Sequence, residues 1–492
     1  MSAPDAPLST KVARGVAWAA GAQAIIAVAD IVSMLFATMW VGTEEIGIAA
    51  LAFPFYTMLD TAADLGVTSS LIQRDDHTPD RVSTVFWFNM LISSGLLGVL
   101  LVIGPLYARA LGHPVVGWLL IVYGGKLIFQ NVYAIPFALL RKELRFSEIA
   151  VARVIAHLAE SASRVIYAML GASVWVFTLA ALTRAFTFGV IMQIRHPFIP
   201  KLVFRPREVV HYVTFGVRSA ASQFLYQLYT NLDYPVVSHY FGDVANGVYW
   251  LAYYIVLEPV KTIANVVIDV AFPTFARLRN DRAQLIDQFI KFTRLNLIAV
   301  LPFVVLILLC IPEFLQIFYG GKDGWTVQHY EQCADAARIL CIVGMLRALG
   351  FIGPPLLDGY GKPELTLRYM IIATLVVPAS FVAGAKLLPQ LGLLSVAVAW
   401  AVGYPLAFAV LMYLIVKTID LPLGAYLKAA WGIIGSCIAG GLAGFGVSLA
   451  LPHESAGVRL IAVGGTAIAV MLTLFATWQK ITPKSIAKSL KG

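Results

Sequence analysis

The chain has 492 residues, of which 59% are hydrophobic and only 13% are charged. This composition excludes a soluble globular protein, because the charged share of such proteins is about 25%. With a formal net charge of +9 and a mean hydropathy of +0.80, we expect an integral membrane protein.

Long apolar segments recur along almost the whole sequence. A spanning helix needs roughly 20 mostly apolar residues, whereas the strands of a membrane barrel have about ten with strict alternation. The sequence therefore predicts an all-α polytopic membrane protein with about fourteen spanning helices. In chain order they cover residues 13–40, 47–72, 82–108, 115–140, 148–170, 173–194, 208–240, 246–275, 289–318, 330–357, 366–388, 391–416, 424–450 and 458–479.

Basic residues gather in alternate connections between these spans. Clusters such as Arg141, Lys142 and Arg145 lie on the side of both termini, and few lie opposite. Since cytoplasmic loops carry the excess of Lys and Arg, we expect both termini in the cytoplasm. The basic charge then predicts contact with the headgroups of membrane lipids and no binding of nucleic acid.

A short turn occurs twice, as "VGTEEIGIAALAF" from residue 41 and "FGDVANGVYWLAY" from residue 241. The two copies match at an offset of 200 residues, which pairs the first two spans with the seventh and eighth. Because six spans separate the copies, the repeat is parallel, about an axis along the membrane normal. We predict a six-helix lobe at 1–200, a second at 201–420, and two additional spans with a basic tail at 421–492. The identities are Ala20 with Ala220, Gln23 with Gln223, Gly42 with Gly242, Gly47 with Gly247, Leu51 with Leu251 and Ala52 with Ala252.

The connections are short. The longest are "RHPFIPKLVFRPR" and "ARLRNDRAQLIDQF", and the second predicts a short amphipathic helix through Leu278, Leu285, Ile286 and Phe289. They leave no room for a soluble catalytic domain, so we expect no enzyme. The sequence also has no phosphate-binding Gly-rich loop, metal cluster or nucleophile constellation, and we expect neither cofactor nor metal.

Ionisable side chains inside spans are costly and therefore mark functional positions. Their number predicts a water-filled central cavity. The cations are Lys126, Arg153, Arg164, Arg184, Arg218, Lys261, Arg338 and Arg347. The anions include Asp30, Asp60, Asp64, Glu160, Asp233, Glu258 and Asp269.

Local spacing assigns some of the cations. Glu160 and Arg164 lie four residues apart and can pair on one helix, and Arg153 can reach the cytoplasmic interface. The place of Arg184 stays open. Lys261 can pair with Glu258 or line the cavity.

Three further cations have no acidic residue three or four positions away. They are Arg218, Lys126 and Arg347, and we expect them to line the cavity. Arg218 lies about 16 Å into its span, near the bilayer centre.

The acidic residues allow two interpretations. Asp60 and Asp64 are like charges one turn apart, a spacing that destabilises a helix unless the face is hydrated or one carboxyl is protonated. With Asp30 they can couple transport to a proton or sodium gradient. The alternative is polar packing against cations of other helices.

Several stretches resemble the polysaccharide transporter family of oligosaccharide flippases, within the multidrug/oligosaccharidyl-lipid/polysaccharide exporter superfamily. The first is "MWVGTEEIGIAALAFPFYTMLDTAADLGVTSSLIQRDD". The others are "RFSEIAVARVIAHLAESASRVIYAMLGASVWVFTLAAL", "AFPTFARLRNDRAQLIDQFIKFTRLNLIAVLPFVV" and "GPPLLDGYGKPELTLRYM". Together they touch most of the first twelve spans.

The resemblance implies a flippase of the cell inner membrane that moves undecaprenyl-diphosphate-linked oligosaccharide units for exopolysaccharide, capsule or O-antigen assembly. It implies a V-shaped pair of lobes around a cationic cavity, with a polysaccharide polymerase and a chain-length regulator as partners. Expected substrate-binding residues are Arg218, Lys261, Lys126, Arg347 and Arg338. Expected coupling or cavity residues are Asp30, Asp60, Asp64, Asp233, Glu258 and Asp269.

Two other functions compete with this one. A multidrug or cation antiporter of the same superfamily would need buried carboxylates and few unpaired cations, which Arg218, Lys126 and Arg347 disfavour. A membrane enzyme of glycan assembly would need a large structured loop, which the short connections disfavour.

Overall fold

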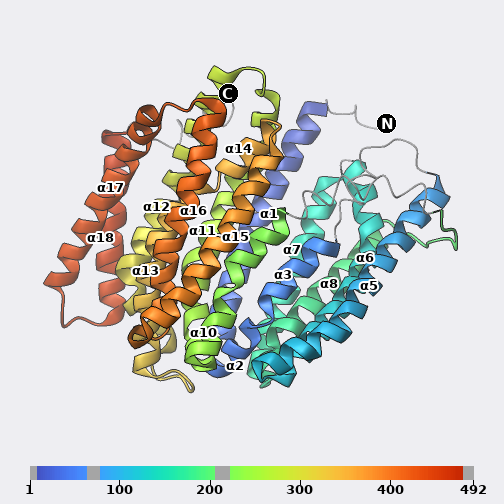
Figure 1. Ribbon diagram of the computed structural model, residues 1–492, viewed down its shortest axis with the longest axis horizontal. Helices are drawn as coiled ribbons and strands as arrows, with labels where there is room; N and C mark the ends of the chain where they lie inside the picture. The colour runs from blue at the N-terminus through green and yellow to red at the C-terminus, as the bar shows by residue number, and fades with distance from the viewer. Residues whose placement is uncertain (1–7, 64–77, 144, 206–221, 480–492) are drawn as a thin grey trace, which may run out of the picture. The chain divides into compact units, whose positions relative to one another are not determined.

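The computed structural model describes residues 8–63, 78–143, 145–205 and 222–479, with the backbone alone described for 8–20, 24 and 61–63. Within these ranges every regular element is helical. The chain divides into two compact units, Met1–His239 and Tyr240–Gly492. Figure 1 shows the helices of each unit. The lobe boundaries expected at residues 200 and 420 stay a prediction.

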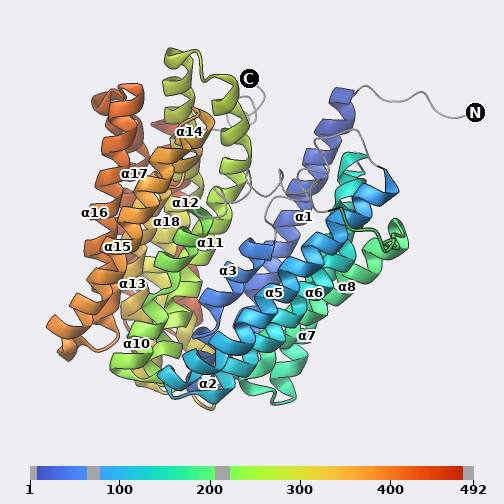
Figure 2. The same ribbon diagram turned by 45° about the vertical axis from the view of Figure 1, so that its right-hand side comes forward.

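The first unit is built from long helices packed side by side. Helix α6 packs against α5 and α8, α7 against α8 and α1, and α3 against α5 and α6; Figure 2 shows α5, α6 and α8 next to one another. Helix α10 (Asp233–Phe241) crosses the division between the units. The other elements are α1 (Leu8–Ala37), α2 (Thr43–Ala50), α3 (Phe53–Ala63), α5 (Pro79–Leu111), α6 (Pro114–Lys142), α7 (Phe146–Met169), η1 (Ser173–Trp175) and α8 (Val176–Arg195).

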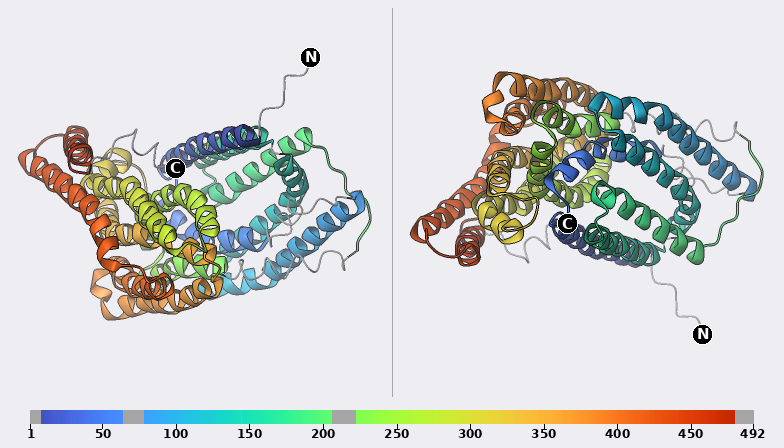
Figure 3. Two further views of the ribbon diagram at one scale, coloured as in Figure 1. Left: turned by 90° about the horizontal axis from the view of Figure 1, so that it is seen from above. Right: turned by 90° about the horizontal axis from the view of Figure 1, so that it is seen from below.

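The second unit packs α13 against α11, α12 and α16. Its last two helices, α17 and α18, pack against each other and against α12, and Figure 3 shows them at the edge of this unit. The elements are α11 (Asp243–Arg277), α12 (Arg282–Tyr319), α13 (Val327–Gly350), α14 (Gly353–Gly359), α15 (Pro363–Leu387), η3 (Pro389–Leu391), α16 (Leu394–Ile419), α17 (Leu423–Ala450) and α18 (Ala456–Thr477).

Nine helical stretches in the described residues are long and apolar enough to cross a membrane. Helices α7 and α11, with 24 and 35 residues, are also long enough, but they carry several ionisable residues each. The protein is an all-α polytopic membrane protein, and about fourteen spans fit its helices. The nine stretches are Pro79–Leu111, Pro114–Lys142, Ser173–Arg195, Arg282–Tyr319, Val327–Gly359, Pro363–Leu387, Leu394–Ile419, Leu423–Ala450 and Ala456–Thr477.

The prediction of a separate amphipathic helix after the eighth span is wrong. Helix α11 continues to Arg277, and after a short turn α12 begins at Arg282 and runs for 38 residues. Leu285 and Phe289 are fully buried, and the Phe289 ring stacks on Tyr426 of α17 with centroids 5.7 Å apart. These apolar residues belong to the first turns of the long helix α12, and they are buried because α17 packs against this part of it.

The repeated turn begins a helix in both units, with different results. In the first copy α2 ends at Ala50 and α3 begins at Phe53. In the second copy α11 is continuous from Asp243. Gly242 before it has a φ of 86°, in the left-handed region that favours glycine.

Candidate functional site

A buried lysine and a half-exposed aspartate join α6 to α3. Lys126 Nζ lies 2.9 Å from both carboxylate oxygens of Asp60 and donates to the Tyr123 hydroxyl at 2.7 Å. Tyr123 in turn donates to Asp60 Oδ2 at 2.9 Å, and Gln130 Nε2 donates to Oδ1 at 3.2 Å. The Lys126 side chain is 1% exposed and that of Asp60 34%. The pair therefore neutralises a cation that would otherwise be buried alone.

Tyr56 holds this part of α3 in place, one turn before Asp60. Its ring stacks on Tyr123 with centroids 3.8 Å apart and an interplanar angle of 2°. Its hydroxyl shares a hydrogen bond of 2.5 Å with the Thr178 hydroxyl of α8. Asp60 is thus presented by a helix that is fixed to two neighbours.

A second ion pair joins α7 to α1. Arg164 Nη1 donates to Asp30 Oδ1 at 2.7 Å and to the Ser33 hydroxyl at 2.8 Å. The Arg164 side chain is 6% exposed and that of Asp30 38%. As with Asp60, the carboxylate lies nearer the surface of the unit than the cation it binds.

Glu160 of α7 pairs with two arginines. It accepts from Arg184 Nη1 of α8 at 3.1 Å and lies 3.5 Å from Arg164 Nη2. The charges of α1, α7 and α8 therefore form one group joined by ion pairs, and Asp60 and Lys126 of α3 and α6 form a second. We call Asp30, Asp60, Lys126, Glu160, Arg164 and Arg184 the N-unit network.

The N-unit network contains as many carboxylates as cations, so it is electrically balanced. Asp30, Asp60 and Arg184 are partly exposed, whereas Lys126, Glu160 and Arg164 lie beneath them. Charged side chains inside a membrane are costly where they contact lipid. The partly exposed members of the network therefore indicate that this face of the unit contacts water.

Arg347 of α13 is buried in the second unit among aromatic rings. Its guanidinium carbon lies 4.5 Å from the Trp400 ring centroid, 5.6 Å from Tyr404 and 5.8 Å from Tyr253. Nη1 donates to the Tyr253 hydroxyl at 3.1 Å. With 2% of the residue exposed, it offers little surface to a ligand in this conformation.

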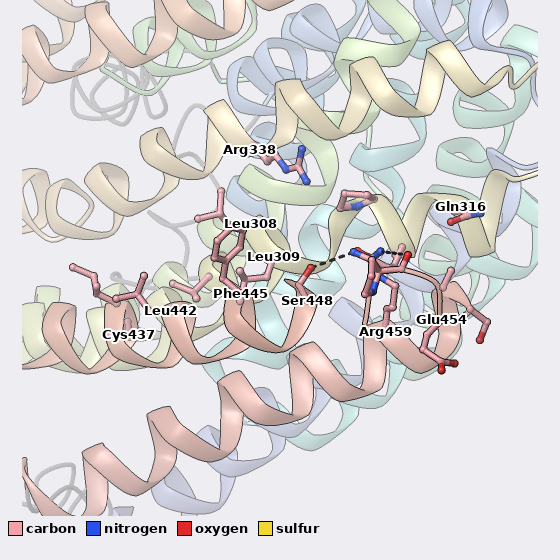
Figure 4. A pocket seen from close by; sticks show the side chains of 18 of the residues that line it. Leu308, Leu309, Gln316, Arg338, Cys437, Leu442, Phe445, Ser448, Glu454 and Arg459 are labelled. Carbon is pink, nitrogen blue, oxygen red and sulfur yellow. Dashed lines mark hydrogen bonds and ion pairs between the residues drawn. The ribbon is translucent and has the colours of Figure 1, made fainter. Parts of the chain in front are cut away.

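The remaining sequence-predicted cations lie elsewhere. Lys261 Nζ contacts Glu258 Oε1 at 2.9 Å, and both side chains are partly exposed. Arg338 of α13 pairs with Asp335 at 3.2 Å and lines a separate cavity formed by α12, α13, α17 and α18 (Figure 4). Arg218 lies outside the described residues.

The other predicted acidic residues do not join the N-unit network in the described contacts. Asp233 is fully buried at the start of α10, and its Oδ1 accepts from the Tyr234 amide at 3.1 Å. Asp269 is on the exposed face of α11. Asp64 lies outside the described residues. No group of His, Cys, Asp and Glu in the described residues could hold a metal ion.

Sequence reasoning missed the links between helices. Glu160 and Arg164 pair with each other as expected, at 3.5 Å. Each also has a shorter contact to another helix, which spacing did not indicate. Tyr123 and Gln130 carried a weak signal, since each lies within one turn of Lys126.

Several known proteins resemble this chain in sequence. A family described as "Polysaccharide biosynthesis protein" matches residues 40–328. Teichuronic acid biosynthesis protein TuaB of Bacillus subtilis is 25% identical over 431 residues, covering 86% of this chain and 87% of that protein. Lipopolysaccharide biosynthesis protein WzxC of Escherichia coli is 24% identical over 391 residues, covering 77% and 76%.

Two solved structures share the fold. The lipid II flippase MurJ, in an inward closed conformation, has a TM-score of 0.70 at 16% identity, over 92% of this chain and 98% of that one. An inward-facing multidrug resistance transporter of the MATE family has a TM-score of 0.62 at 20% identity, over 80% and 95%. Because the family match covers more than half of the sequence, the chain belongs to the polysaccharide biosynthesis protein family.

Proposed function

We propose that this protein is a flippase that moves polyprenyl-diphosphate-linked oligosaccharide units across the inner membrane by alternating access. The N-unit network carries the proposal, because several partly exposed ionisable groups inside a membrane bundle indicate a hydrated path for polar cargo. The family match and the relatives named for teichuronic acid and lipopolysaccharide biosynthesis support this choice of cargo.

On this proposal the protein is a transporter and not an enzyme. Both termini lie in the cytoplasm, and a polysaccharide polymerase and a chain-length regulator act on the exported units. Transport is coupled to a proton or sodium ion that binds at the two half-exposed carboxylates, Asp30 and Asp60. The predicted V-shaped arrangement of two lobes provides the alternating openings.

The described cations divide into two groups by their exposure. The partly exposed Lys261 contacts the diphosphate, since a cation must reach the cargo to bind it. Arg218, which lies outside the described residues, is assigned the same contact from the sequence. Lys126 and Arg347 are too buried for such a contact and instead hold α6 and α13 against their neighbours. Arg338 lines the separate cavity of α12, α13, α17 and α18, so it is not assigned a contact with the diphosphate.

An antiporter of drugs or cations is the second candidate. The half-exposed carboxylates Asp30 and Asp60 suit a cationic cargo, and the MATE transporter shares the fold. Deleting the gene separates the two candidates. The flippase proposal expects loss of a surface polysaccharide and accumulation of lipid-linked units on the cytoplasmic side. Normal polysaccharide with raised drug sensitivity would instead establish the antiporter.

A pair of lysine variants then tests the cargo site in the deletion strain. Lys261→Ala removes an expected diphosphate contact and should reduce export, with membrane insertion unchanged. Lys291→Ala is the matched control, because Lys291 pairs with Asp287 on the exposed face of α12. Equal export by both variants would contradict the role given to Lys261.

A further inference from the structure

The cavity bounded by α12, α13, α17 and α18 has a volume of about 1020 Å³. It lies wholly within the second unit, and no member of the N-unit network lines it. The proposed transport cycle therefore leaves it without a role.

The lining is mostly polar on one side of the cavity and mostly apolar on the other, and Arg338 of α13 lies between the two sides. Figure 4 shows Gln316, Glu454, Arg459 and Ser448 toward one side and Leu442 and Cys437 toward the other. The polar side lies near the ends of helices: Glu313 is about 9 Å from the end of α12 by helical rise. Val305, also in the lining, is about 21 Å from the same end. This gradient matches a membrane lipid, with its headgroup near the helix ends and its chains toward the bilayer centre.

An ion pair between α12 and α18 stands at the polar side. Arg459 Nη2 lies 2.9 Å from Glu313 Oε1 and donates to the Ser448 hydroxyl at 3.1 Å. Glu313 Oε2 and Arg459 Nε are buried and contact no hydrogen-bonding partner in the described part of the chain. The Glu313 side chain is only 10% exposed. The ion pair therefore retains one unused acceptor and one unused donor. Buried polar atoms without partners are destabilising, so a ligand that supplies these partners would be favoured.

We propose that this cavity binds a membrane phospholipid whose headgroup combines a primary ammonium with a phosphodiester. After rotation of Glu313 about its Cγ–Cδ bond and of Arg459 about its aliphatic bonds, the ammonium donates to Glu313 and the phosphate accepts from Arg459. The acyl chains lie along the apolar lining of α12 and α17. Glu313 and Glu454 outnumber Arg459 at the polar side, and Arg338 is already paired with Asp335. Anionic headgroups and polyprenyl diphosphates are therefore disfavoured.

Native mass spectrometry of the full-length protein in detergent tests this headgroup preference. The probes are phosphatidylethanolamine, phosphatidylcholine and phosphatidylglycerol with identical acyl chains, and undecaprenyl diphosphate. We expect phosphatidylethanolamine to bind about tenfold more tightly than phosphatidylcholine, whose quaternary ammonium has no N–H to donate. Equal binding of these two lipids would overturn the proposal. Tighter binding of phosphatidylglycerol or of undecaprenyl diphosphate would also overturn it.

Two variants locate the binding. Glu313→Gln should reduce phosphatidylethanolamine binding to the level of phosphatidylcholine, whereas Glu364→Gln on the exposed start of α15 should leave it unchanged. If Glu313→Gln does not fold, Leu442→Trp narrows the apolar side from α17 and should weaken all three phospholipids equally. Unchanged binding to folded Leu442→Trp would overturn the proposed location.

Discussion

In the first unit an ion pair joins the second span to the fourth, through Asp60 of α3 and Lys126 of α6. The parallel repeat predicted from the sequence pairs these spans with the eighth and tenth. There Arg347 of α13 lies against aromatic rings, including that of Tyr253 on α11. Equivalent pairs of helices thus hold a buried cation in different ways.

This difference determines what each unit presents at its surface. In the first unit the carboxylate partner of the lysine remains one-third exposed and can meet an ion or a cargo. In the second unit, the ring faces of Trp400 and Tyr404 enclose the cation and both residues are buried. At this position the first unit therefore presents a carboxylate, whereas the second unit encloses its charge.

The helices that receive these contacts also differ. Pro54 follows the break between α2 and α3, whereas the repeat places Tyr254 at the matching position of the continuous helix α11. A proline in a helix interior removes one hydrogen bond and clashes with the preceding turn. The substitutions below exchange or remove these features.

The largest effect is expected for Tyr254→Pro, which places the proline of the first unit into α11. It should reduce the free energy of unfolding by more than about 3 kcal/mol, and it also removes the ring that stacks on Trp250. Chemical unfolding in detergent, followed by tryptophan fluorescence, measures the loss. The control Tyr254→Leu keeps the helix and should lose clearly less. Equal losses would show that the continuous helix is unimportant.

Asp60→Ala should reduce the free energy of unfolding by about 3–5 kcal/mol, because it leaves the Lys126 ammonium buried without its carboxylate. Asp335→Ala breaks the exposed pair with Arg338 and should cost less than about 1 kcal/mol. Replacing both partners, as Asp60→Leu with Lys126→Met, should restore most of the stability. If Asp60→Ala and Asp335→Ala unfold alike, the ion pair is not what holds α3 to α6.

Trp400→Phe tests the aromatic environment of Arg347. The smaller ring binds a cation less strongly and leaves a gap, so we expect a loss of about 1–2 kcal/mol in the free energy of unfolding. Trp431→Phe, at an exposed position of α17, should change it by less than about 0.5 kcal/mol. A loss for Trp400→Phe no larger than for this control would contradict the aromatic stabilisation of the cation.

The smallest effect is expected for Pro54→Ala. Proline is tolerated in the first turn of a helix, so stability should change by no more than about 1 kcal/mol. The new amide can continue the helix. In the native protein the amides of Leu51 and Ala52 donate to carbonyls three positions back. Their hydrogen exchange should become slower in the variant. Unchanged exchange would mean that Pro54 does not cause the break.

Much of the fold could be predicted from the sequence, because a long apolar run has few alternatives to a helix inside a membrane. Which prolines interrupt a helix could not be predicted. Pro54 and Pro354 lie at helix starts, whereas Pro259, Pro302 and Pro405 lie inside continuous helices. The sequence alone does not say which turns neighbouring helices support.

The members of the N-unit network could be named from the sequence, but their partners on other helices could not. Lys126 and Asp60 are 66 positions apart, and Arg164 and Asp30 are 134 apart. A single sequence reveals pairs within one or two turns of a helix, such as Glu160 with Arg164, which lie 3.5 Å apart. Contacts between helices depend on packing that spacing does not contain.

The most direct test of the account is transport by the purified protein in liposomes. A fluorescent lipid-linked oligosaccharide is placed in both leaflets, and a membrane-impermeant quencher reports how much of it reaches the outer one. We predict that the full chain makes the inner pool accessible and that Lys261→Ala slows this exchange, whereas Lys291→Ala does not. An inner pool that stays protected, as in empty liposomes, would contradict the proposed flippase.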